Sequence, residues 1–132
     1  MEKKLQTKLA TSLLLLRVGI FIVFLFWGLD KILVPEHATK VLSGFYGIDI
    51  SDNAMMAMGV AQLGFLGAFV VGMWKKYTYG AILVLHAGST FASFAKYMDP
   101  FNNLLFFASW PMLAACVAIF LLRDYDTYSV SN

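Results

Sequence analysis

The chain has 132 residues, a formal net charge of +2 and one cysteine; 60% of its residues are hydrophobic and only 14% are charged. An average soluble domain is about 45–50% apolar and about 25% charged, so a soluble helical bundle of this length would have too few charges to cover its apolar side chains. The small net charge argues against a nucleic-acid-binding protein, and a lone cysteine, Cys116, excludes an internal disulfide and a CxxC motif.

Four apolar segments follow one another along the chain, at about 10–34, 54–74, 78–97 and 102–122. Each is close to the ~20 residues that a helix needs to cross the hydrocarbon core of a bilayer. Helices are expected because they satisfy their backbone groups within one segment, as lipid requires. We therefore expect an all-α integral membrane protein, an antiparallel four-helix bundle that forms a single domain over residues 1–132 and has the lipid bilayer as its surroundings.

The first segment also resembles a signal peptide, because a basic start precedes an apolar core. That interpretation is not favoured, since the run from Leu9 to Val34 is too long and no small-residue cleavage site follows Trp27.

The connections between the segments differ in length. Residues 35–53 form a long connection, which we expect to be a loop that lies on the bilayer surface or folds back on the bundle. Ser51-Asp52-Asn53 at its end offers N-cap chemistry for the second helix. Residues 75–77 and 98–100 predict tight turns. Pro111 lies inside the fourth segment, where it predicts a kink.

Basic residues are distributed unevenly between the two sides of the predicted bundle, with six on the side of the termini and three on the side of the long connection. The positive-inside rule then places the N and C termini in the cytoplasm. We expect the inner (plasma) membrane of a bacterial-type cell. The six are Lys3, Lys4, Lys8, Lys75, Lys76 and Arg123, and the three are Lys31, Lys40 and Lys96.

Three charged residues lie within the first apolar segment. Arg17 is about seven residues into it, where a cation either snorkels to the headgroups or faces the bundle and makes an ion pair or anion contact. At 100° per residue, Asp30 and Lys31 fall on different faces of the helix. We expect Asp30 to point into the bundle as a buried latch and the longer Lys31 to snorkel outward.

The third segment carries a row of polar residues on one helical face, which we call the His86 seam: His86, Ser89, Thr90, Ser93 and Tyr97. Such a face is either a structural hydrogen-bond seam between helices or a ligand or proton site. His86 matters most, because the charge of an imidazole can change near neutral pH. Gln62, about 12 Å into the second helix at 1.5 Å per residue, is expected to bond another helix.

Haem and metal ions are not expected at this seam. His86 is alone within the predicted spans, since His37 lies in the long connection and is expected to be solvated. A bis-histidine haem would need two chains, and a metal site needs more ligands than one helix offers. Cys116, deep in an apolar run, is expected to pack.

Small residues recur along the second segment. Gly64, Ala68 and Gly72 are spaced by four residues, and Ala57 and Ala61 continue a similar stripe. Small residues at this spacing let membrane helices approach closely, so the stripe is expected to serve packing.

The stretch Leu16-Arg17-Val18-Gly19, followed by Trp27-Gly28-Leu29-Asp30-Lys31-Ile32, resembles the first-helix signature of the DoxX-like family of small four-helix inner-membrane proteins. The layout agrees along nearly the whole chain, with a long first external connection and a glycine-rich second helix. The resemblance implies the fold. It also implies a range of roles, because some relatives are subunits of thiosulfate:quinone oxidoreductases, some are linked to redox stress, and distant animal relatives act as membrane chaperones for receptor channels.

Three functional hypotheses follow. The first is a membrane component of a redox system that holds a quinone or similar amphipathic ligand in the His86 seam, where His86 bonds a carbonyl or exchanges a proton. The second is a non-enzymatic, chaperone-like scaffold with a membrane-protein partner or a second copy of itself, and the third is a small transporter. The sequence does not decide whether the protein is an enzyme. The expected ligand-site residues are His86, Ser89, Thr90, Ser93, Gln62, Trp27 and Trp110, and the expected structural polar residues are Arg17, Asp30, Lys31 and Tyr97.

Overall fold

A computed structural model describes residues 2–130, and that part of the chain is helical with no strand. The all-α prediction is confirmed for these residues. The α-helices are α1 (Lys3–Leu33), α2 (Pro35–Tyr46), α3 (Asp52–Val70), α4 (Lys75–Ala92), α5 (Phe94–Tyr97) and α6 (Ser109–Leu121). Three short 3-10 helices cover Pro100–Asn102, Leu104–Ala108 and Arg123–Tyr125.

Three helical stretches are long and apolar enough to cross a membrane: Lys3–Leu33, Asp52–Val70 and Leu104–Leu121. The chain is therefore a membrane protein by the length and composition of its helices. Helix α4, which covers most of the third expected span, is not one of these stretches. Its mean hydropathy is lowered by Lys75 and Lys76 in its first turn and by His86 in its middle.

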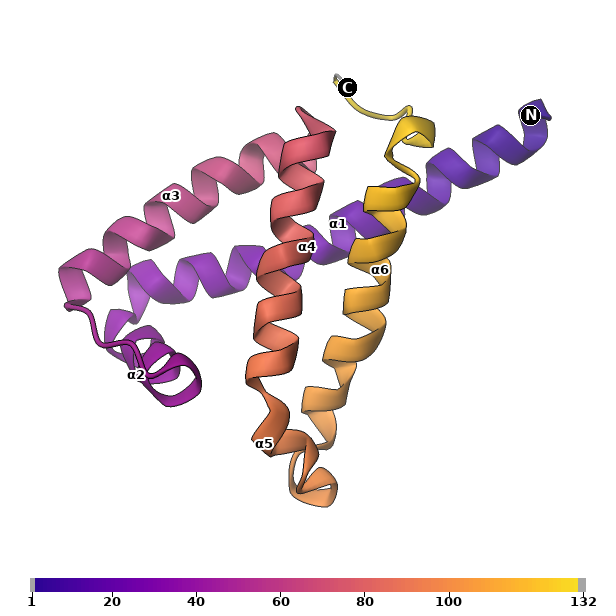
Figure 1. The fold of residues 1–132 in the computed structure, drawn as a ribbon. Coiled ribbons are helices and arrows are strands. Elements are labelled where there is room, and N and C mark those ends of the chain that lie inside the picture. The colour runs from indigo at the N-terminus through magenta and orange to yellow at the C-terminus, as the bar shows by residue number, and fades with distance from the viewer. Residues whose placement is uncertain (1, 131–132) are drawn as a thin grey trace.

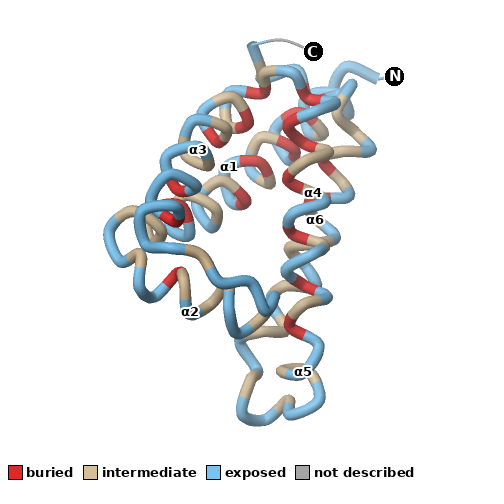
Figure 2. Tube along the Cα trace, turned by 60° about the vertical axis from the view of Figure 1, so that its left-hand side comes forward, coloured by how far each residue is buried: buried red, intermediate tan, exposed pale blue. Residues whose placement is uncertain are grey.

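The helices form two antiparallel pairs that cross each other (Figure 1). Helix α1 packs most closely with α3, and α4 packs most closely with α6, whereas α3 and α4 share few contacts. The buried faces of all four helices meet along the inside of the molecule (Figure 2). The core is formed by Leu13, Ile20, Leu66, Phe69, Tyr79, Ile82, Cys116 and Ile119.

The long connection contains a helix, α2, in place of the expected loop. Pro35 starts it at the first helical position, where a missing N–H costs no hydrogen bond. It ends at Gly47, whose φ of 67° is the left-handed conformation that glycine adopts easily. The expected cap of the next helix is confirmed, because Ser51 Oγ accepts a hydrogen bond of 3.1 Å from the Ala54 amide.

The turn between α3 and α4 lies earlier than expected. The prediction of a turn at residues 75–77 is wrong, because Lys75 already begins α4 and the chain reverses at residues 71–74. Gly72 has φ 76° there, and Trp74 has φ 50°.

The fourth expected span is not one kinked helix. Its start, Leu104–Ala108, is a 3-10 helix, and α6 begins at Ser109, so Pro111 falls in the first turn of α6. A proline at that position removes no intrahelical hydrogen bond. The chain therefore changes from 3-10 to α geometry at Ser109, close to where the kink was expected.

Glycines bring α1 and α3 into close contact. A Cβ placed on Gly59 would lie 2.7 Å from Ile32 Cγ1, 2.9 Å from Lys31 Cβ and 3.0 Å from the Gly28 carbonyl oxygen. The last of these is backbone and cannot move aside alone. The α1–α3 spacing therefore requires glycine at position 59.

We expect Gly59→Ala to lower the free energy of unfolding by about 1–3 kcal/mol, because the added methyl group forces the two backbones apart. The measurement is an SDS unfolding titration in mixed micelles. Gly64→Ala is the matched control in the same helix, because nothing lies within 4 Å of a Cβ at Gly64. Equal effects of the two substitutions would contradict the close-contact argument.

Candidate functional site

A buried polar cluster joins α1, α4 and the segment that follows α6. The side chains of Arg17 and Asp126 are 2% and 0% exposed, and Arg17 Nη1 lies 2.7 Å from Asp126 Oδ2. Tyr79 completes a triangle, because it accepts a bond of 3.0 Å from Arg17 Nη1 and donates one of 2.5 Å to the same carboxylate oxygen. Of the two alternatives for Arg17, the structure shows the ion pair that faces the bundle.

The backbone of the segment after α6 is held by the same cluster. Arg17 Nη2 donates to the Tyr128 carbonyl at 2.5 Å, and Lys75 Nζ donates to the Asp126 carbonyl at 2.7 Å. The Val130 amide donates to the Val71 carbonyl at 3.0 Å. The segment is therefore fixed to the turn between α3 and α4 as well as to Arg17.

Gly72 and Lys75 shape the place where this segment lies. A Cβ on Gly72 would collide with Ser129 Cβ, so the turn needs glycine for space as well as for its positive φ. Lys75 precedes the expected third span and also donates to Ser129 Oγ at 2.9 Å.

The Arg17–Asp126 pair is not fully satisfied. Arg17 Nε and Asp126 Oδ1 are buried and have no hydrogen-bond partner among the described residues. Burial of two charges is costly unless every polar atom is hydrogen-bonded. The pair therefore determines where the segment docks and adds little net stability. Sequence reasoning missed Asp126 because it stands in a short polar stretch 109 positions from Arg17.

The His86 seam is an interface between helices. His86 is 7% exposed, and its Nε2 lies 3.1 Å from the Ser109 carbonyl oxygen at the start of α6. Thr90 Oγ1 donates to the His86 carbonyl at 2.8 Å, and Ser93 Oγ donates to the Ser89 carbonyl at 3.0 Å. The two buried hydroxyl donors are thus used within α4, while Ser89 itself is exposed.

Gln62 links the other helix pair. Its Nε2 donates a hydrogen bond of 2.8 Å to the Phe24 carbonyl on α1. The Phe24 ring in turn meets the His86 ring edge-on, with centroids 6.4 Å apart. Phe24 therefore lies between Gln62 and His86, and both polar side chains stabilise contacts between helices.

The two tryptophans expected to flank a ligand have different neighbours. Trp27 stacks on His37 of α2, with centroids 6.4 Å apart and planes at 14°. Trp110 packs against Phe91 and Tyr97 on the other helix pair. The hydroxyl of Tyr97 is buried and has no partner among the described residues.

Asp30 differs from the expectation. Asp30 does not point into the core; its carboxylate lies 2.8 Å from Nδ1 of His37, and the two side chains are 21% and 53% exposed. His37 was expected to be solvated and instead holds α2 to the end of α1. The stem of Lys31 packs against Gly59, and its Nζ lies 3.4 Å from the Trp27 carbonyl.

The buried polar contacts form two sets, the cluster around Arg17 and Asp126 at one end of the bundle and the His86 seam further along α4, while Asp30, Trp27 and His37 meet separately where α1 joins α2. No known family model matches the chain, and no curated protein and no solved structure is significantly similar to it. Its function is therefore inferred from its own residues.

We expect Asp126→Asn to lower the free energy of unfolding by about 3–5 kcal/mol, because it leaves the Arg17 charge buried without a counter-ion. Asp124→Asn is the matched control, since Asp124 is exposed and lies in the same short segment. It should change the free energy by less than about 0.5 kcal/mol. SDS unfolding titrations measure both, and a loss below 1 kcal/mol for Asp126→Asn would show that the ion pair does not hold the fold.

Proposed function

We propose that the chain is a DoxX-like protein of a bacterial-type inner membrane, in which α1, α3, α4 and α6 cross the bilayer as an antiparallel four-helix bundle with both termini in the cytoplasm. Support comes from α4, which runs beside α6 although its own composition is less apolar. Its 18 residues extend about 27 Å at 1.5 Å per residue, close to the ~30 Å hydrocarbon core. The basic residues of its first turn then lie at the cytoplasmic interface.

We further propose that the protein acts as a non-enzymatic scaffold that docks a partner transmembrane helix. The observation that carries this proposal is the exposed small-residue face of α3, formed by Ala57, Ala61, Gly64 and Gly67. Nothing in the described chain lies within 4 Å of a Cβ at Gly64 or Gly67. A face of this kind lets a second helix approach closely enough for backbone contact.

Other exposed faces of the bundle differ from this one. On α1, large apolar side chains such as Leu15 and Phe26 are 68% and 64% exposed, as suits contact with lipid chains. Small side chains offer lipid little area but offer a helix a flat surface. The face on α3 is therefore better suited to a protein partner, either another membrane protein or a second copy of this chain.

The His86 seam favours the same role. Its hydrogen bonds to Ser109 and within α4 serve to hold the two helices of that pair together. A scaffold needs a rigid bundle and no reactive group, and the seam supplies rigidity.

A photo-cross-linking experiment tests the scaffold. A benzophenone amino acid at Val60, which is 64% exposed beside the small-residue face, should give cross-linked adducts in native membranes. Gly64→Leu should reduce their yield about tenfold, because a large side chain holds a partner helix away. The bundle should tolerate that change, since Gly64 faces open space.

The matched control carries the benzophenone at Phe26 of α1, which is 64% exposed, as Val60 is. It should give few adducts, and Gly64→Leu should not affect them. An adduct of twice the chain's mass identifies a second copy as the partner. Equal cross-linking at the two positions would refute the docking face.

A second candidate function is the binding of a quinone-like ligand in a redox system. It is favoured by the Tyr97 hydroxyl, which is buried without a partner among the described residues. The Tyr97 ring centroid lies 5.3 Å from those of both Trp110 and Phe107. A hydroxyl donor among aromatic rings suits a flat molecule with a carbonyl acceptor. Electron transfer would need a redox partner or bound cofactor.

Binding of a short-chain quinone to the purified protein in detergent tests this candidate. His86→Ala and Tyr97→Phe should each weaken binding, Tyr97→Phe by up to about tenfold, because it removes one hydrogen bond. Tyr46→Phe, at an exposed position of α2, should not. Unchanged affinity in both seam variants would exclude this site.

A further inference from the structure

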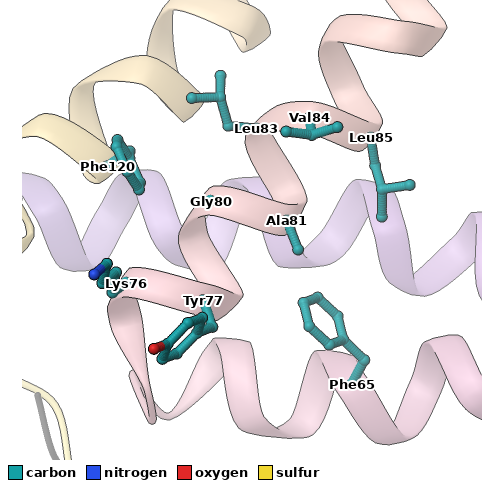
Figure 3. A pocket seen from close by; sticks show the side chains of 9 residues that line it. All are labelled: Phe65, Lys76, Tyr77, Gly80, Ala81, Leu83, Val84, Leu85 and Phe120. Atoms are coloured by element: carbon teal, nitrogen blue, oxygen red, sulfur yellow. The ribbon is translucent and has the colours of Figure 1, made fainter.

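Two hollows of opposite character meet at the first turn of α4. An apolar groove of about 770 Å³ crosses the outward face of α4 at Gly80 and Ala81, between Phe65 of α3 and Phe120 of α6 (Figure 3). A smaller, basic pocket of about 200 Å³ is lined by Lys75, Lys76, Arg123 and Asp124. Lys76 lines both. The two hollows therefore lie side by side at Lys76, one apolar and the other lined by cations.

The pocket has three cations and one carboxylate around it. Lys75 is already bonded to the segment after α6, so Lys76 and Arg123 are the cations that can meet a ligand. Lys76 is exposed, with its Nζ 5.9 Å from the centroid of the Tyr77 ring. Lys76 lines the end of the groove and Arg123 lines the neighbouring pocket, so the pocket complements a single anionic group.

Arg123 connects the pocket to the wall of the groove. Its guanidinium lies 4.4 Å from the centroid of the Phe120 ring, and Nη1 donates to the Phe120 carbonyl at 2.7 Å. A guanidinium has five N–H donors in a planar fork that matches phosphate oxygens, so this bond leaves others for a ligand. The apolar wall and the anion-binding group are thus held together.

The length of the groove matches one leaflet of a bilayer. Lys76 at one end and Leu85 at the other are nine residues apart, which is about 14 Å along a helix. Half of the ~30 Å hydrocarbon core is about 15 Å. The groove begins at the charged end and runs toward the bilayer centre, as an acyl chain does.

We propose that this composite site binds an anionic phospholipid, with the headgroup phosphate at Lys76 and Arg123 and one acyl chain along the groove over Gly80 and Ala81. The order of charge followed by about 14 Å of apolar surface selects an amphiphile rather than a free anion. The site is separate from the small-residue face of α3 and does not depend on the scaffold function.

Native mass spectrometry tests the site on the full chain released from membranes that contain equal amounts of phosphatidylglycerol and phosphatidylcholine with identical acyl chains. The wild type should retain phosphatidylglycerol preferentially. Lys76→Gln and Arg123→Gln should each lower the retained ratio about fivefold, because a basic residue near anionic lipid contributes about that factor. Lys96→Gln, at the opposite end of the helix pair, should leave the ratio unchanged.

A second pair of variants tests the acyl-chain part. Ala81→Phe fills the floor of the groove and should reduce phosphatidylglycerol retention, whereas Ala114→Phe, at an exposed position of α6, should not. Inorganic phosphate at millimolar concentration should fail to displace the lipid. The proposal is overturned if Lys76→Gln and Arg123→Gln leave the ratio unchanged, if Lys96→Gln lowers it equally, if Ala81→Phe has no effect, or if phosphate alone displaces the lipid.

Discussion

The buried ion pair between Arg17 and Asp126 is the constraint on which much of the structure depends. A buried cation on the first helix needs a counter-ion, and the segment after α6 supplies it from the other end of the chain. Tyr79 is fixed between the two charges, and Lys75 holds the backbone of the same segment. One polar contact thus sets the relative positions of α1, α4 and the last described residues.

The two helix pairs are held by different forces. In the α1–α3 pair, the missing side chain of Gly59 permits backbone contact, and Gln62 adds one hydrogen bond across the helices. In the α4–α6 pair, the bond from His86 to Ser109 links the two helices, and both helices contribute side chains to the core shared by all four. Most buried polar groups are hydrogen-bonded within the bundle. The surfaces that we propose for other molecules are the small-residue face of α3 and the groove on α4 with its basic pocket.

Much of the fold follows from the sequence because a lipid environment requires apolar helices long enough to cross it. Apolar length predicted four membrane spans, and three of them contain a helical stretch long and apolar enough to cross a membrane. The run Ser51-Asp52-Asn53 marked the start of α3, where Ser51 is the cap. The helix α2 was missed because glycines and charged residues suggested a loop, whereas Pro35 and Gly47 in fact bound a helix. The contacts of the candidate site were harder to predict from the sequence. Periodicity placed His86, Thr90 and Ser93 on one face, but it could not show that their donors are used within the protein.

The sequence by itself determined the helical class, the membrane as solvent and the polar face of α4, because these depend on composition and on spacing within single helices. Only the tertiary structure decided that Arg17 faces Asp126 rather than the headgroups, and that Asp30 pairs with His37 rather than entering the core. Such choices depend on which side chain from another part of the fold comes within 3 Å, and periodicity within one helix carries no information about that distance. The groove and the basic pocket also depend on the tertiary structure, since they exist only where α3, α4 and α6 are brought together.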